Sequence, residues 1–201
     1  KDYDNAIKFK SDFAFAYNNR GSANRCLKQY AEAISDFDKA IDLNKDYALV
    51  YNNRGLVKYD LKQYAEAIKD YDNAIKFKSD FAFAYNSLGN AKRALKQYAE
   101  AISDFDKAID LNKDYAEAYN NRGLVKYDLK HYDAAIEDYG KAIELKPDYA
   151  LAYNNRGVTY KAVGKKTNAR LDCERALELA KAQNDKENIE RVTNNLALLD
   201  K

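Results

Sequence analysis

The chain lacks tryptophan and methionine, and its 201 residues include one proline, seven glycines, two cysteines and one histidine. So few prolines and glycines disfavour an all-β fold and favour helices joined by short loops. Cys26 and Cys173 stand far apart, and neither has the neighbouring ligands that a zinc or redox motif needs. We therefore expect no metal, no cofactor and a reduced, intracellular (cytoplasmic) protein.

No charge of one sign dominates either. The chain carries 34 Lys and Arg against 32 Asp and Glu, a formal net charge of +2. This balance gives no indication of a nucleic-acid partner or an anionic membrane surface. No apolar run approaches the roughly 18 residues of a membrane span. With 46% apolar and 33% charged residues, the composition is that of a folded chain.

What the chain does have is a period of 34 residues. Glycines recur at this spacing, at Gly21, Gly55, Gly89, Gly123 and Gly157. A ring residue follows each glycine by 16 positions, at Phe37, Tyr71, Phe105 and Tyr139, until Cys173 takes that place in the last unit. A second period of 68 lies on top, since residues 27–48 are identical to residues 95–116. Two-unit blocks have been copied with little change.

Each unit has the pattern of two amphipathic helices. The second helix is expected to begin near Tyr30, with Ala33, Ile34, Phe37 and Ala40 on one stripe. The first helix is expected to follow an aspartate that acts as its N-cap. These aspartates are Asp12, Asp46, Asp80, Asp114 and Asp148.

The spacing Tyr17-x2-Arg20-Gly21, followed by Ala33-x3-Phe37 and Ala40, resembles the tetratricopeptide repeat, a 34-residue helix–turn–helix unit. The resemblance covers residues 1–183. It implies an all-α fold, a right-handed superhelical α-solenoid of antiparallel helix pairs with a concave groove lined by the first helices. The family's tryptophan is tyrosine here, its leucine before glycine is arginine in four units, and its closing proline survives only as Pro147.

The repeat frame divides the chain into a single array. Residues 1–13 are expected to be the second helix of a truncated repeat, so that the chain starts in the middle of a unit. Residues 184–201 are expected to form a C-terminal capping helix, with Ile189, Val192, Leu196 and Leu199 on one side. The five full repeats between them are residues 14–47, 48–81, 82–115, 116–149 and 150–183, the last one degenerate.

No group of residues predicts catalysis. Carboxylate pairs such as Asp36 and Asp38 stand two apart on a helix and do not face each other. The single histidine, His131, falls in a turn between helices. We therefore expect a protein that is not an enzyme.

A helical wheel divides the recurring stretch Tyr-Asn-Asn-Arg-Gly into faces. Tyrosine, arginine and glycine fall on the arc that packs on the second helix, where a guanidinium needs a charged partner. We predict that each arginine pairs with an aspartate of the second helix in its own or the preceding repeat. The arginines are Arg20, Arg54, Arg122 and Arg156; the aspartates are Asp36, Asp70, Asp104, Asp138 and Asp172, with Asp2 before them. Leu88 stands where a fifth arginine would, so Asp70 or Asp104 should have another partner or be more exposed.

The asparagines are predicted to face the groove in two rows. The first asparagine row is Asn18, Asn52, Asn86, Asn120 and Asn154. The second asparagine row, at the groove edge, is Asn19, Asn53, Asn121 and Asn155, with Ser87 as a gap. A file of amides can bind the backbone of an extended peptide, as the asparagine ladder of some tetratricopeptide-like domains does. The alternative is that these amides bond only within the fold or to water.

Further groove residues alternate with the 68-residue period and complete the predicted peptide site. They are Phe15, Arg25, Leu49, Tyr59, Phe83, Arg93 and Tyr127. The basic residues of a chaperone-type carboxylate clamp are absent.

The favoured function is a non-enzymatic scaffold that holds an extended segment of a partner protein. A self-associating module that stacks through the truncated N-terminal helix is the alternative, giving a homo-oligomer. Single-stranded RNA is disfavoured, because only Arg25, Arg93 and Lys161 are basic groove positions.

Overall fold

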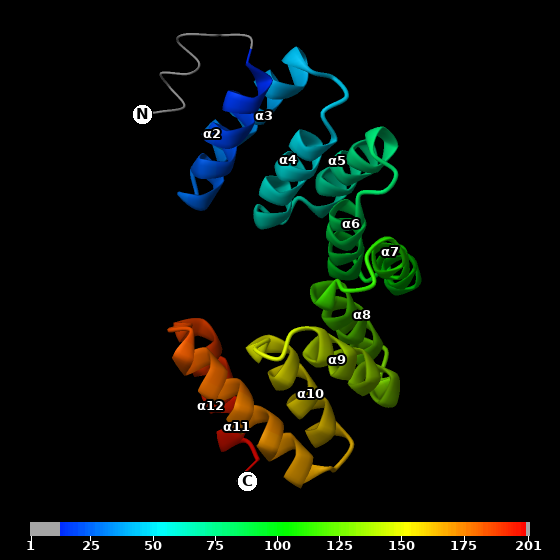
Figure 1. Ribbon diagram of the computed structural model, residues 1–201, viewed down its shortest axis with the longest axis vertical. Helices are drawn as coiled ribbons and strands as arrows, with labels where there is room; N and C mark the ends of the chain where they lie inside the picture. Colours follow the sequence, from blue (N-terminus) through cyan, green and yellow to red (C-terminus); the bar gives the residue numbers. More distant parts are fainter. Residues whose placement is uncertain (1–12, 200–201) are drawn as a thin grey trace. The chain divides into compact units, whose positions relative to one another are not determined.

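The structure is a computed structural model that describes residues 13–199. This part of the chain holds eleven α-helices and no strand (Figure 1). The all-α class and the helix-pair architecture predicted from the sequence are confirmed. The first helices of the pairs are α2 (Ala14–Cys26), α4 (Ala48–Asp60), α6 (Ala82–Ala94), α8 (Ala116–Asp128) and α10 (Ala150–Ala162). The second helices are α3 (Tyr30–Leu43), α5 (Tyr64–Phe77), α7 (Tyr98–Leu111), α9 (Tyr132–Leu145) and α11 (Lys166–Ala182), and α12 (Lys186–Ala197) follows.

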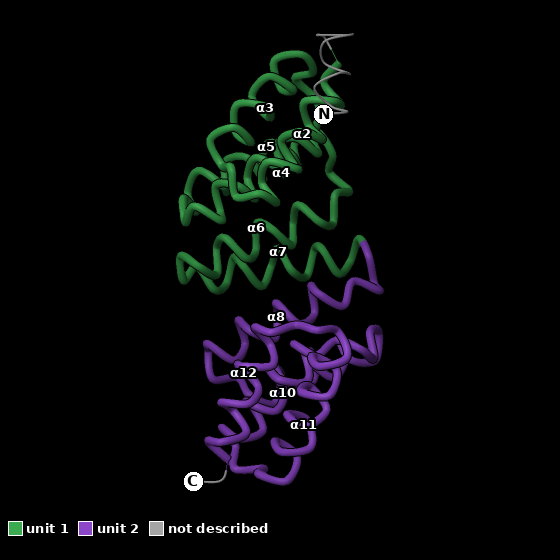
Figure 2. Tube along the Cα trace, turned by 90° about the vertical axis from the view of Figure 1, so that its left-hand side faces the viewer, with its two compact units in different colours: residues 1–111 green, residues 112–201 purple. Residues whose placement is uncertain are grey.

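The chain divides into two compact units, residues 1–111 and residues 112–201 (Figure 2). The described part of the first unit holds α2 to α7, and that of the second holds α8 to α12. The helix predicted within residues 1–13 falls almost wholly outside the described residues. None of the described helices is long and apolar enough to cross a membrane.

Each first helix turns back into its second helix through three residues. In four repeats the middle turn residue is a lysine in the left-handed region, with φ between 59° and 61°. Lys28 shows the hydrogen bonds of this turn, because its N–H donates to Arg25 and the next N–H donates to Asn24. The lysines are Lys28, Lys62, Lys96 and Lys130, and Gly164 takes the place in the fifth repeat. Glycine is the residue that adopts this conformation without strain.

The predicted aspartate N-caps are wrong. The residue before each first helix is an aromatic, as at Tyr47 before α4, and it makes no side-chain cap bond. The aspartate one position earlier serves the turn through its backbone, since the Asp46 carbonyl accepts from the Ala48 N–H. The Asp46 N–H in turn donates to Asn44 Oδ1. An aspartate cap does occur at Asp185, whose side chain accepts from the Asn188 N–H at the start of α12.

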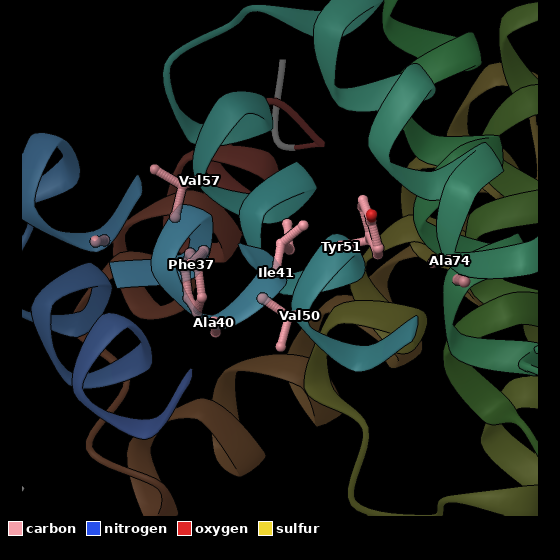
Figure 3. Close-up of a cluster of buried hydrophobic side chains, with 9 residues drawn as sticks. Phe37, Ala40, Ile41, Val50, Tyr51, Val57 and Ala74 are labelled. Carbon is pink, nitrogen blue, oxygen red and sulfur yellow. The ribbon is translucent and has the colours of Figure 1, made fainter. Parts of the chain in front are cut away.

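A glycine facing a ring holds each helix pair together. A Cβ placed on Gly21 would lie 2.8 Å from Cε1 of Phe37, so only glycine allows this approach. Phe37 is fully buried, and Ile41 of the same helix packs with Val50 and Val57 of α4 (Figure 3). The core therefore runs from one pair into the next rather than closing within one repeat.

Helix α12 packs on α10 and α11 at the end of the second unit (Figure 1). Val192 is fully buried and Leu199 nearly so, while Leu196 packs against the same cluster. Ile189 packs against Leu179 and Ala180 of α11. The stripe that the sequence assigned to a capping helix thus lies against the last repeat.

Candidate interaction face on the first helices

The first helices of successive repeats lie next to one another within each unit. In the first unit α4 contacts both α2 and α6. In the second unit α10 contacts both α8 and α12. Residues that share a position in the repeat are therefore neighbours across these helices, and the predicted site residues can be followed as rows.

The arginines do not reach this face. Each guanidinium instead forms a two-bond ion pair with an aspartate on the second helix of its own repeat. Two N–H groups of each guanidinium donate to the two carboxylate oxygens at 2.6 to 3.0 Å. The pairs are Arg20–Asp36, Arg54–Asp70, Arg122–Asp138 and Arg156–Asp172. Asp2, the sixth predicted partner, lies outside the described residues.

A third member of this cluster escaped the sequence analysis. Lys58 Nζ lies 2.6 Å from Asp70 Oδ2, and Lys126 Nζ lies 2.8 Å from Asp138 Oδ2. In the first repeat Asn24 donates to Asp36 instead. These residues share one position of the repeat, where the fifth repeat has Tyr160, so the polar residues that recur at the 34-residue spacing were the available signal. These three nearly buried carboxylates thereby gain a further donor, which offsets part of their desolvation.

The electrostatics of Arg54 follow from this geometry. Burial lowers the pKa of its guanidinium, but hydrogen bonds and charges from Asp70 and Asp38 outweigh burial and raise the pKa overall. In Arg156 the hydrogen bond to Asp172 is the largest cause of a raised pKa. Removing one partner of a fully buried pair costs about 3 to 5 kcal/mol; the loss of Arg54 should cost less, because its side chain is partly exposed and Lys58 stays beside Asp70.

The third repeat has Leu88 in place of the arginine, and it shows how the aspartate is paired when the arginine is missing. Leu88 is buried in an apolar cluster, and Asp104 has Lys92 at 2.7 Å as its cation. Asp104 is also the most exposed of the five aspartates, at 9%. Burial raises its pKa and Lys92 only partly opposes this effect. One lysine therefore replaces the arginine fork incompletely.

The first asparagine row is not on an open face, and the prediction that it lines a peptide groove is corrected. These side chains are between 0% and 7% exposed. Where two first helices contact each other within one unit, as α2 and α4 do, the next first helix covers the amide. A helical wheel describes only one helix and cannot show this cover. The corrected residues are Asn18, Asn52, Asn86, Asn120 and Asn154.

The two rows instead bond to each other across repeats. Asn53 Nδ2 donates to Asn18 Oδ1 at 2.9 Å, and Asn18 Nδ2 donates to Asn19 Oδ1 at 3.2 Å. The second unit repeats the relay, with Asn155 donating to Asn120 and Asn120 to Asn121. In α12, Asn195 donates to Asn154 at 2.7 Å and so continues the ladder. The asparagine ladder thus links neighbouring first helices through side-chain hydrogen bonds.

Ser87 interrupts the ladder in the first unit. The side chain of Asn52 is fully buried, and neither its Nδ2 nor its Oδ1 has a hydrogen-bond partner among residues 13–199. In the preceding repeat the equivalent Oδ1, on Asn18, is satisfied by Asn53. Ser87 replaces that donor and is itself buried, but its side chain is too short to bond the amide. The substitution in the odd repeat therefore leaves an unsatisfied buried amide one repeat away.

What remains open on the first helices of the first unit is an apolar row. Phe15, Leu49 and Phe83 occupy the same position in three successive repeats and are 51%, 40% and 46% exposed. The rings of Phe15 and Phe83 each lie beside the ring of the preceding N-cap residue, Phe13 or Phe81. We call these three residues the apolar row.

The other predicted groove residues are placed as follows. Arg25 forms a two-bond ion pair with Asp60 of the next repeat, at 2.8 and 3.3 Å. Tyr59 is half-buried against Tyr64 at a ring distance of 5.1 Å, and Tyr127 packs similarly on Tyr132. Arg93 is half-buried on α6.

The cysteines and acidic residues make no metal site in the described part of the chain. Cys26 is exposed, and Cys173 is buried against Gly157. Burial raises the pKa of the Cys173 thiol to about 11.

An array of helix pairs with buried ties and an open first-helix face defines the class of protein: an α-helical repeat scaffold for protein–protein interactions. Sequence models described as TPR repeat and tetratricopeptide repeat match the chain. The TPR repeat model matches residues 55–92, 89–130 and 123–164, more than half of the chain. Two tetratricopeptide repeat models match residues 14–47 and 150–183. The chain belongs to the tetratricopeptide-repeat family, which is generally made up of non-enzymatic scaffolds that bind protein or peptide partners.

Solved structures with the same fold are numerous, whereas no curated protein sequence matches the chain. MamA is 28% identical with a TM-score of 0.69, over 81% of this chain and 95% of that one. YrrB, described as a TPR protein with an unusual peptide-binding site, is 23% identical with a TM-score of 0.65, over 96% and 98%. TTC0263, a TPR protein of Thermus thermophilus, is 20% identical with a TM-score of 0.80, over 92% and 99%.

Proposed function

We propose that the chain holds an extended peptide segment of a partner protein across the first helices of the first unit, with the apolar row as its main contact. The observation that carries the proposal is the exposure of Phe15, Leu49 and Phe83 at equivalent positions of three adjacent helices. Large apolar side chains left open in a row mark interaction surfaces, and aromatic anchors supply much of the binding energy at such surfaces.

The second asparagine row supports the proposal, although one polar atom of each of its side chains named here is already used within the ladder. Asn19 uses its Oδ1 within the ladder, and its half-buried Nδ2 has no partner among residues 13–199. Asn53 uses its Nδ2, which leaves Oδ1 without a described partner. Each of these two asparagines can therefore form hydrogen bonds to a peptide backbone beside the apolar row with only one of its two polar atoms: Asn19 can donate, and Asn53 can accept.

A displayed library of random 16-residue peptides, selected on the intact chain, tests the proposal. The affinity of the tightest peptide is then measured by fluorescence anisotropy for the parent and for Phe15→Ser/Phe83→Ser. We expect the double variant to lose at least about 2 kcal/mol of binding free energy, since both are anchors. Phe77→Ser, which alters an exposed ring on the second helix α5, is the control and should bind as the parent does. Equal losses in both variants would refute the first-helix site.

The role of the second asparagine row is tested separately. Asn19→Asp keeps the acceptor that Asn18 needs and removes the Nδ2 donor. We expect a loss of about 1 kcal/mol in peptide binding, the net value of one hydrogen bond. If Asn19→Asp binds the peptide as tightly as the parent does, the second asparagine row does not contact the peptide and serves only the hydrogen bonds between helices. Self-association through residues 1–13 falls almost wholly outside the described residues, and no described contact carries it.

A further inference from the structure

The fifth repeat contains a cavity at the place where the other repeats have a ring. In the first four repeats a phenyl or phenol ring fills the space against the repeat glycine, as Phe37 does against Gly21. In the fifth repeat the residue against Gly157 is Cys173, whose side chain lacks the ring. A cavity of about 350 Å³ lies there, bounded by α10, α11 and α12 and by Tyr127 of α8.

The walls of this cavity are mainly apolar. Val158 of α10, Leu198 and Leu199 just after α12, and Cys173, itself 1% exposed, contribute apolar surface to the lining. An apolar cavity of about 150 Å³ already admits a benzene ring, and ligand pockets begin at about 300 Å³. The space is therefore large enough for a bulky aliphatic or aromatic group, and Asn195 and Lys161 add polar atoms to its lining.

One cation stands in the lining of this pocket. Lys161 occupies the position that Arg25 has in the first repeat, where Asp60 of the next repeat neutralises the guanidinium. No carboxylate among the described residues lies within ion-pair distance of Lys161. Burial and the Asp172 charge raise the pKa of the Cys173 thiol and the Lys161 charge lowers it, while Asp172 is itself paired with Arg156. The lining therefore combines apolar surface with an exposed, uncompensated ammonium group.

We infer that this pocket binds a bulky apolar side chain of a partner peptide that has a carboxylate beside it, with the side chain over Cys173 and the carboxylate at Lys161. The inference rests on the proposed function for the peptide nature of its ligand. The carboxylate comes either from the end of the peptide chain or from an acidic neighbour. The ring that the fifth repeat lacks is thus supplied by the partner.

Small probes test the pocket alone. A ¹⁵N-labelled Cys26→Ser chain is titrated with N-acetyl-phenylalanine and, for the acidic neighbour, with N-acetyl-phenylalanyl-aspartic acid α-amide, whose side-chain carboxylate is free. We expect saturable amide shifts at Gly157 and Leu199 with at least one of them. N-acetylglycine, which lacks the side chain, should produce none. Absence of saturable shifts with both phenylalanine probes overturns the inference.

Two variants identify the contacts. Cys173→Phe restores the ring of the other repeats and should abolish the shifts while the chain keeps its helical spectrum. Lys161→Gln should weaken the better carboxylate probe by about two- to five-fold, as expected for an exposed ion pair, and leave N-acetyl-phenylalaninamide unchanged. Because Cys173→Phe could disturb α12, Val158→Trp serves as a second filling variant from the α10 wall. Probe binding that survives both folded filling variants contradicts the inference.

The two proposals fail separately. Phe15→Ser/Phe83→Ser lies in the first unit and should not change the affinity of the probes for this pocket. If library peptides bind the apolar row but the probes do not bind the pocket, the present inference is wrong and the proposed function stands. If the probes bind the pocket but no peptide binds the apolar row, the proposed function is wrong.

Discussion

Ser87→Asn should stabilise the chain, because the new side-chain amide could donate a hydrogen bond to Asn52 Oδ1, as Asn53 does to Asn18 Oδ1. Both polar atoms of the Asn52 side chain are buried without a partner among the described residues. One intramolecular hydrogen bond contributes about 0.5 to 1.5 kcal/mol net, and an unsatisfied buried group costs about 1 to 3 kcal/mol. Allowing for the ordering of the longer side chain, we expect a gain of about 1 to 2 kcal/mol in the free energy of unfolding.

Urea unfolding followed by circular dichroism measures this gain. The matched control is Asn53→Ser, which creates the same gap opposite Asn18 and removes the 2.9 Å bond. It should lose about as much as Ser87→Asn gains. In an Asn52→Ala background Ser87→Asn should bring no benefit, since its acceptor is gone. An equal gain in both backgrounds would refute the hydrogen-bond explanation.

Four further substitutions test the packing and the charge clusters by urea unfolding. Tyr71→Phe should gain about 1 kcal/mol in the free energy of unfolding, because the buried Tyr71 hydroxyl has no hydrogen-bond partner in the described part of the chain. Gly55→Ala should lose about 1 to 3 kcal/mol, because the new Cβ would lie 2.6 Å from a ring carbon of Tyr71. Gly140→Ala, with its nearest neighbour at 3.7 Å, should instead gain about 0.5 to 1 kcal/mol; losses at both glycines would contradict the packing argument. The pKa of Asp104 is raised, so its contribution to stability is fully present below the unfolded value of about 3.9 and is lost as pH rises through the folded pKa. Asp104→Asn should therefore gain stability relative to the parent as pH rises from 4 to 7, and a relative loss over that range would refute the burial argument.

The periodic features of the fold were readable from the sequence because each depends on contacts inside one repeat. The 34-residue spacing of glycine and ring predicts the helix pair, and the structure places Gly21 against Phe37 within one pair. Likewise, each arginine lies against an aspartate 16 residues later in the same repeat, as Arg20 does against Asp36. Sequence alone left open whether that partner lay in the same or the preceding repeat.

Features that depend on the neighbouring repeat were not readable. Asn18 falls on the outer arc of its own helix, yet the next first helix covers it and Asn53 bonds to it. The left-handed turn at Lys28 was also hidden, because lysine has no preference for positive φ and the closure of the pair imposes it. The cavity at Cys173 could not be predicted, because its shape depends on how α12 packs against α10.

The central claim is that a partner peptide lies on the first helices, and amide chemical-shift mapping tests it most directly. A library-selected peptide is added to the ¹⁵N-labelled chain, and the shifted amides are assigned. We expect shifts on α2, α4 and α6 around Phe15, Leu49 and Phe83, with α3, α5 and α7 unchanged. Shifts concentrated on the second helices would contradict it.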